Sequence, residues 1–262
     1  MIVVNAKNFV ISKLEQGYYT FSLNEAENAI GAGEKTEKAL NRLAKQGWII
    51  SPSRGFFVII DPQHQGKGHL PVEWFVDDWM KHLGGNYYIG ILTAAMLHGA
   101  SHQKPQQVQI IRDKEFRSIN KGAYNISFYY KKVIPYECCE QRQSPAGYYK
   151  ISSPEMTAYD ILRYPSACPS INLAATVFQE LGEKINSERL AALIETDAEI
   201  ATLQRLGWLL DNTGWSEKTG LLSERFREKK MVWRLMRTDM VNNGPRELKW
   251  RVIANAEVEA DI

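Results

Sequence analysis

A row of basic side chains near the N-terminus has the spacing of a surface that contacts phosphates and base edges. Its members recur at steps of three or four residues and are Lys35, Lys38, Arg42 and Lys45. A helix over Glu34 to Gln46 displays them on one face, while Leu40 and Leu43 point the opposite way, toward a core. Asn41 suits adenine and Arg42 suits guanine, because each bonds bidentately to those bases. This chemistry is sequence-specific recognition of duplex DNA.

The elements around this segment must position it. Lys7 to Gln16 and Ser22 to Ile30 read as two preceding helices, the second opened by a capping box in which Ser22 and Glu25 bond each other's backbone. Gly47 fits just past the end of the charged helix. Strands at 48–50 and 56–60 follow, joined by a turn with Arg54 at its tip. This order predicts a winged helix-turn-helix that lays its last helix in the major groove, with Lys35 and Arg54 near phosphates.

A blander interpretation competes with DNA binding. A charged helix face is usually only a solvated face. Up to Ile60 the chain has seven Lys or Arg and five acidic residues, a net charge of +2, which is weakly basic for a nucleic-acid binder. Many winged helices bind proteins instead. The order of the elements favours DNA, but the charge does not decide the matter.

The chain length and the predicted elements indicate an α+β protein of two domains. The chain has 262 residues, so some 200 remain after a winged helix. The polar, aperiodic run 61–68 reads as a linker between residues 1–62 and a larger mixed α/β domain, residues 69–262. We see no secretory signal and no apolar run that spans a bilayer, so we expect a cytoplasmic protein. Three cysteines without a C-x-x-C pair fit free thiols in a reducing compartment.

The larger half mixes both kinds of element. Apolar periodicity predicts helices at 72–83 and 88–98, and later at 173–181, 188–194 and 198–209. Ser153, Pro154 and Glu155 open a further helix. Strands are predicted at 108–111, 126–130, 148–151 and 249–255. For Lys131 and Lys132 we expect positions at the solvated end of the second of these strands.

A second basic region spans Ser223 to Arg251. It has nine Lys or Arg against four acidic residues, a net charge of +5. It is either an exposed face of mixed charge or a candidate surface for phosphates or an acidic partner. The residues that crowd its first half are Arg225, Arg227, Lys229, Lys230, Arg234 and Arg237.

Catalytic motifs are weak in this chain, and we expect no enzyme, no metal and no cofactor. His98 and His102 have an i, i+4 spacing that suits a metal, but a structural hydrogen bond for His98 at a helix end is the better interpretation. Glu247-Leu248-Lys249 has the E-x-K spacing of some metal-dependent nucleases, with Asp239 upstream. A nuclease targeted to DNA by the winged helix therefore stays as the alternative function.

Four stretches together resemble one protein family, and their order across nearly the whole chain is more specific than any one of them. They are Tyr87–Gly99 continuing to Gln103-Lys104-Pro105, Ile151–Asp160 with Arg163-Tyr164-Pro165, Leu203–Leu210, and Trp250–Asn255. The chain is similar to the AbiEi antitoxins of bacterial type IV toxin–antitoxin, or abortive-infection, systems of phage defence. The family usually carries Gly after the Tyr-Pro pair, where this chain has Ser166-Ala167-Cys168-Pro169.

The resemblance implies a transcriptional regulator and antitoxin. Its winged helix binds operator DNA, represses its own operon and, as helix-turn-helix proteins commonly do, pairs on an inverted repeat. Its C-terminal domain counteracts a nucleotidyltransferase-like toxin, without need of a stable complex. No heptad repeat is present, so we expect a monomer when free that pairs on DNA.

Overall fold

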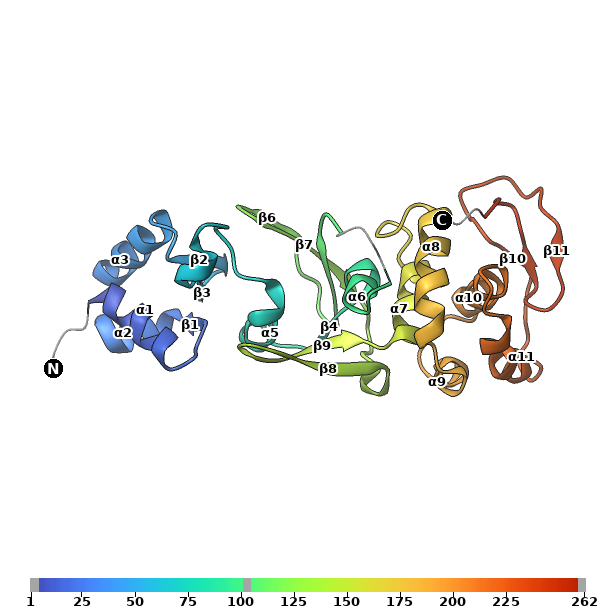
Figure 1. Ribbon diagram of the computed structural model, residues 1–262, viewed down its shortest axis with the longest axis horizontal. Coiled ribbons are helices and arrows are strands. Elements are labelled where there is room, and N and C mark those ends of the chain that lie inside the picture. The colour runs from blue at the N-terminus through green and yellow to red at the C-terminus, as the bar shows by residue number, and fades with distance from the viewer. Residues whose placement is uncertain (1–4, 101–104, 259–262) are drawn as a thin grey trace. The chain divides into compact units, whose positions relative to one another are not determined.

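The structure is a computed structural model that describes residues 5–100 and 105–258. The protein is of mixed α+β type, with helices and three sheets among these residues (Figure 1). It forms two compact units. The first holds residues 1–87, 116–127 and 141–150, and the second holds residues 88–115, 128–140 and 151–262. The sequence-based division into 1–62 and 69–262 stays a prediction.

The N-terminal elements follow the order helix, strand, two helices and two strands. They are α1 Ala6–Glu15, β1 Thr20–Ser22, α2 Leu23–Ile30, α3 Glu34–Lys45, β2 Ile49–Ser53 and β3 Phe56–Ile59. The strands form an antiparallel sheet of order β1-β3-β2. Phe9 and Val10 of α1, Ala26 of α2, and Leu40 and Leu43 of α3 pack in one apolar core.

Local signals explain where these helices begin and end. The predicted capping box is confirmed: Ser22 Oγ accepts from the Glu25 N–H at 3.2 Å, and Glu25 Oε2 accepts from the Ser22 N–H at 2.8 Å. Gly47 follows the C-cap Gln46 of α3 and has φ +76°, a conformation that costs glycine little. Local sequence therefore fixes the start of α2 and the end of α3.

The predicted linker contains a short helix. Asp61 caps α4 Pro62–Gln65, and its carboxylate accepts from the His64 N–H at 2.8 Å. Asp followed by Pro is a helix-start signal, but the segment was predicted to be a linker because it is polar and aperiodic. After it come a 3-10 turn Val72–Trp74 and α5 Val76–Leu83, so the helix predicted at 72–83 is interrupted at Phe75.

The second half of the chain is built on a six-stranded sheet and a helical layer. The sheet has strand order β6-β7-β5-β4-β9-β8, with β4 parallel to β9 and β6 antiparallel to β7. These strands are β4 Tyr87–Ile89, β5 Val108–Arg112, β6 Ile119–Lys121, β7 Tyr124–Tyr130, β8 Cys139–Ser144 and β9 Gly147–Ser152. The predicted strands near 108, 126 and 148 are confirmed. The polar strand β8 was not predicted, because it lacks apolar alternation.

The helix predicted at 88–98 is wrong in its first part. Tyr87–Ile89 is the buried strand β4, and α6 begins only at Ile91 and ends at Leu97. A continuous apolar run does not distinguish a buried strand from a buried helix. Gly90 separates the two elements, and a Cβ there would lie 2.8 Å from the Ile111 side chain.

The helical layer centres on α7 Pro154–Arg163, which packs against α6, α8, α9 and α10 (Figure 1). The remaining helices are α8 Ile171–Leu181, α9 Ser187–Ala192, α10 Ile200–Asn212 and α11 Gly220–Phe226, with 3-10 turns at Tyr136–Cys138, Gly182–Lys184, Leu193–Glu195 and Ser216–Lys218. The helices predicted after Ser153 and near 173, 188 and 198 are confirmed.

A small sheet ends the described chain. Its order is β10-β12-β11, from Arg234–Leu235, Val252–Ile253 and Arg246–Glu247. The strand predicted at 249–255 is therefore shorter than expected. Trp250, just before β12, packs where Gly207 of α10 has no side chain, because a Cβ on Gly207 would lie 2.4 Å from the indole. Gln204 Nε2 donates to the Trp250 carbonyl at 2.8 Å. Two of the four family-like stretches thus pack on each other.

Candidate functional site

The predicted basic face of α3 is exposed in the structure. The side chains that sequence analysis placed on it, and that lie on the surface, are Lys35, Lys38, Asn41, Arg42 and Lys45. Leu40 and Leu43 are 2% and 5% exposed, as their opposite placement predicts. Lys38 pairs with Glu34 at 2.7 Å, but both side chains are largely exposed. Such a surface pair contributes little to stability and is readily exchanged for a phosphate contact.

The segments beside α3 set its approach to a ligand. Gly31 and Gly33, with φ of +116° and +96°, form the turn from α2, and the Thr36 hydroxyl donates to the Gly31 carbonyl. Arg54 lies exposed at the β2–β3 turn, and its carbonyl is 3.2 Å from His82 Nε2. The turn backbone is thereby tied down, while the guanidinium stays on the surface.

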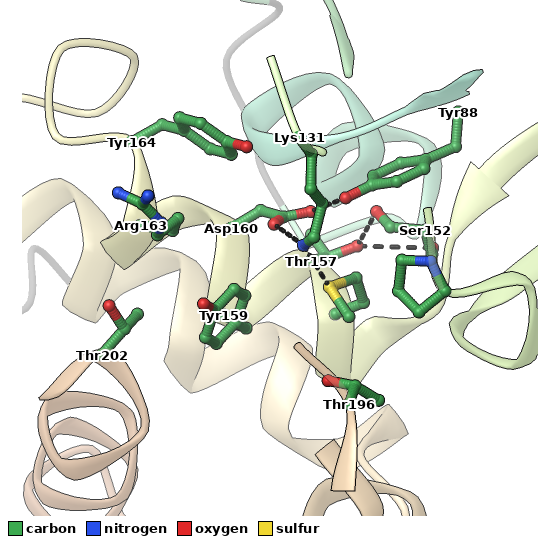
Figure 2. Close-up of polar contacts among 12 residues, drawn as sticks. Tyr88, Lys131, Ser152, Thr157, Tyr159, Asp160, Arg163, Tyr164, Thr196 and Thr202 are labelled. Carbon is green, nitrogen blue, oxygen red and sulfur yellow. Dashed lines mark hydrogen bonds and ion pairs between the residues drawn. The ribbon is translucent and has the colours of Figure 1, made fainter. Parts of the chain in front are cut away.

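A buried polar network lies at the centre of the second unit (Figure 2). Lys131 Nζ lies 3.0 Å from Asp160 Oδ1 of α7. The Tyr88 hydroxyl of β4 donates to the other carboxylate oxygen of Asp160 at 2.8 Å. Asp160 is fully buried and the Lys131 side chain is 12% exposed. The expectation that Lys131 lies at a solvated strand end is therefore wrong, because the buried carboxylate draws this ammonium inward. Lys132 is exposed.

The pKa of the Asp160 carboxyl depends on its burial and on its neighbours. Burial raises the pKa of the Asp160 carboxyl, while the charge of Lys131 and the hydrogen bonds from Tyr88 and Lys131 oppose that rise. Burial and the Asp160 charge also raise the pKa of Tyr88, so its phenol keeps its proton and acts as a donor. The network holds α7 against β4 and the end of β7, and its burial points to a positioning role.

A second set of polar groups joins β9 to α6 and α7. Ser152 Oγ and Thr157 Oγ1 are 2.6 Å apart (Figure 2), and His98 Nε2 lies 2.7 Å from the Ser152 carbonyl. The structural hydrogen bond predicted for His98 at a helix end is confirmed, while His102 falls outside the described residues. Glu155, expected only as an early acid of a helix, is buried, and its Oε1 accepts from the N–H of the α9 cap Asn186 at 2.8 Å.

The basic segment is divided by its pairings. Arg225 pairs with Glu195 at 3.1 Å. Arg237 pairs with Asp239 at 2.6 Å, and its Nη1 donates to the Pro169 carbonyl. The other four basic residues predicted for this surface are exposed and are Arg227, Lys229, Lys230 and Arg234. Sequence alone could not identify the pair of Arg225 with Glu195, because these residues are distant along the chain, whereas Asp239 is only two residues from Arg237.

The E-x-K residues have other partners in the structure. Lys249 Nζ donates to Asp211 Oδ2 at 2.7 Å and to Thr219. Asp239 is paired with Arg237, and Glu247 lies exposed on β11. Among residues 5–100 and 105–258, no group of three or more His, Cys, Asp or Glu side chains is arranged to hold a metal ion.

A family model matches the middle of the chain. Residues 88–212 match the family described as the AbiEi antitoxin C-terminal domain. This part of the chain is similar to an antitoxin domain. The match contains Tyr88, Lys131, Ser152, Thr157 and Asp160, so the buried network lies within the matched residues. Residues of two family-like stretches that are far apart in the sequence meet in it.

Structural comparison extends further than the sequence match. A crystal structure of the RV2827C protein from Mycobacterium tuberculosis is similar with a TM-score of 0.68 at 15% identity, over 94% of this chain and 90% of that one. At this identity the likeness shows the fold alone. No curated protein matches the chain. In the part of the chain that the structure describes, no helix is both long and apolar enough to cross a membrane.

Proposed function

We propose that this chain is the antitoxin of a type IV toxin–antitoxin system and the transcriptional autorepressor of its own operon. The match of residues 88–212 to the AbiEi antitoxin C-terminal domain carries the first half of the proposal. Its partner is a nucleotidyltransferase-like toxin, encoded beside it and counteracted in the cytoplasm without a stable complex. Coexpression with the toxin of the adjacent gene tests this half: the full chain restores growth. Failure to restore growth with soluble, folded protein would refute it.

The second half of the proposal is DNA binding by the N-terminal elements as a winged helix-turn-helix. It is supported by the order of α1 to β3, by the antiparallel sheet and by the exposed basic face of α3. In this proposal Lys38, Asn41, Arg42 and Lys45 face the major groove, and Lys35 and Arg54 contact phosphates. Arg42→Ala weakens operator binding by about 1–3 kcal/mol if Arg42 reads a base. Lys67→Ala, an exposed change outside α3, serves as the control in the same gel-shift titration at fixed salt.

The operator is proposed to be an inverted repeat in the promoter of the operon. Two copies of the chain, each monomeric when free, occupy half-sites about one helical turn, or a multiple of it, apart. Footprinting of the promoter shows two protected half-sites, and sedimentation of the free chain shows a monomer. A single unpaired footprint contradicts this arrangement.

Neutralisation is assigned to the second half of the chain, with the basic segment as its contact surface. Arg225 and Arg237 already have ion-pair partners, so the test changes only the basic residues that have none among the described residues. These are Arg227, Lys229, Lys230 and Arg234. Changing these four to Glu abolishes growth rescue while operator binding persists. Rescue that survives the change removes the segment from the proposal.

The test uses the full chain because a cut at residue 69 would divide the first unit. Trp79 Nε1 donates to Ser53 Oγ at 3.0 Å, and Thr20 donates to Asp78 at 2.8 Å. Lys121 donates to the Ser51 carbonyl at 2.9 Å. A fragment that begins at residue 69 loses these partners, so point changes separate the two activities more cleanly than truncation.

A further inference from the structure

A cavity of about 320 Å³ lies in the second unit, and its lining includes Pro165 and Arg205 of two family-like stretches and Arg237 of the basic segment. Its walls come from the end of α7, the loop that leads to α8, the first turn of α8, the middle of α10, and residues 236–239 after β10. This volume is at the lower end of the range of small-molecule sites, roughly 300–1,000 Å³. Its apolar lining includes Ile161, Ala174 and Met236, all nearly inaccessible to solvent.

Arg205 of α10 places a positive charge in the wall of this cavity. Its Nε donates to the Leu235 carbonyl at 2.9 Å, and its two terminal amino groups have no protein partner among the described residues. The cavity's other guanidinium, on Arg237, has a protein partner at each of its three nitrogens: Nε and Nη2 donate to Asp239, and Nη1 donates to the Pro169 carbonyl. Arg205 is therefore the donor that the cavity leaves available to a ligand.

The surroundings of Arg205 favour an anion beside it. Burial is the main cause that lowers the pKa of Arg205, and the charge of Arg234 lowers it further, while the charge of Glu199 raises it. Glu199 is itself paired with Arg163 at 2.9 Å. Arginine nevertheless stays protonated at neutral pH. A partly buried cation without its own counter-charge is unfavourable. An anion in the cavity would relieve this cost.

One further feature of the walls favours an anion, and one opposes it. The first turn of α8, at Ser170 and Ile171, borders the cavity, and a helix N-terminus is the positive end of the helix dipole. The carboxylate of Asp239 also borders it, but its ion pair with Arg237 offsets its charge.

We propose that this cavity binds a small organic anion, whose carboxylate or phosphate is held by the terminal amino groups of Arg205 and whose compact apolar body packs against Ile161, Ala174 and Met236. A guanidinium offers two parallel N–H donors, which match either oxyanion bidentately. Arg237 of the basic segment lines this cavity, but the proposal does not rest on the proposed function, and its test reads only ligand binding.

Isothermal titration of the full chain tests the proposal with phenyl phosphate and benzoate as probes. Benzyl alcohol is the neutral control, and inorganic phosphate lacks the apolar body. At least one organic anion binds more tightly than both controls. Arg205→Gln weakens this binding roughly ten- to hundredfold, as expected for hydrogen bonds to a charged group. Arg189→Gln, which removes an exposed guanidinium on α9, leaves it unchanged.

A second measurement reads the apolar wall of the cavity directly. With ¹³C-methyl labels on the seven methionines, the organic anion shifts the Met236 signal and leaves that of the exposed Met240 in place. Met236→Leu and Met240→Leu assign the two signals. The proposal is overturned if neither organic anion binds better than benzyl alcohol and inorganic phosphate. It is also overturned if a folded Arg205→Gln chain binds as tightly as wild type, or if the Met236 signal stays unmoved.

Discussion

The Lys131–Asp160 pair predicts a strong, pH-dependent coupling in stability. At 3.0 Å and an effective dielectric constant of about 20, the two charges attract by about 5–6 kcal/mol, most of which offsets their removal from water. Removing one partner leaves the other buried and uncompensated, which costs about 3–5 kcal/mol. We therefore expect Lys131→Met and Asp160→Asn each to lower the free energy of unfolding by about that amount.

A double-mutant cycle measures this coupling by urea denaturation at pH 7.5. Asn at position 160 still accepts the Tyr88 hydrogen bond, so the cycle isolates the ion pair. The double variant should be clearly more stable than the sum of the single losses predicts, with a coupling energy of at least about 2 kcal/mol. Lys132→Met, at the exposed neighbouring position, should change stability by less than about 0.5 kcal/mol. Single losses under about 1 kcal/mol that simply add would refute the reasoning.

The sign of the pH dependence follows from Asp160. Burial raises the pKa of its carboxyl in the native protein, and Lys131 opposes that rise. In Lys131→Met the opposition is gone, so the native carboxyl holds a proton that the unfolded one, with a pKa of about 3.9, releases. Between that pKa and the raised native pKa, the free energy of unfolding falls as the pH rises. The loss caused by Lys131→Met should be smaller at pH 5 than at pH 8.

Two other changes test the packing and the caps. Gly207→Ala places a Cβ 2.4 Å from the Trp250 indole, so it should lower the free energy of unfolding by about 1–3 kcal/mol. The matched control is Gly220→Ala, where a Cβ meets nothing within 4 Å. Equal melting temperatures for the two variants would contradict the close packing at Gly207. Ser22→Ala removes the acceptor of the Glu25 N–H and should cost about 0.5–2 kcal/mol. Its control is Ser12→Ala on α1, and a loss no greater than the control's would show that the capping box contributes nothing.

The sequence predicted the N-terminal elements well because their signals are local. Ser22 and Glu25 are three residues apart, and Gly47 directly follows the C-cap of α3. The buried faces of these helices repeat at helical spacing. Each feature is visible within about two turns of chain, so a short window of sequence contains the physical cause.

The buried network could not be predicted in the same way. Lys131 and Asp160 are distant in the sequence, and only the packing of α7 beside the end of β7 turns a lysine inward. The strand β4 lies in an apolar run that also fits a helix, so the sequence did not identify it as a strand. The pairing of Arg225 with Glu195 likewise depends on tertiary contacts. These features arise from proximity in space, which residue spacing alone does not encode.

The measurement that tests the account most directly is a charge reversal on α3 in the full chain. Lys38, Arg42 and Lys45 are changed to Glu together, and the variant is assayed for operator binding and for growth rescue beside the toxin. A control with the same change in charge carries Glu at the exposed positions Lys67, Lys132 and Arg189. We expect the α3 variant to lose operator binding and keep growth rescue, and the control to keep both. Operator binding at wild-type affinity, or loss of rescue by the folded α3 variant, would contradict the account.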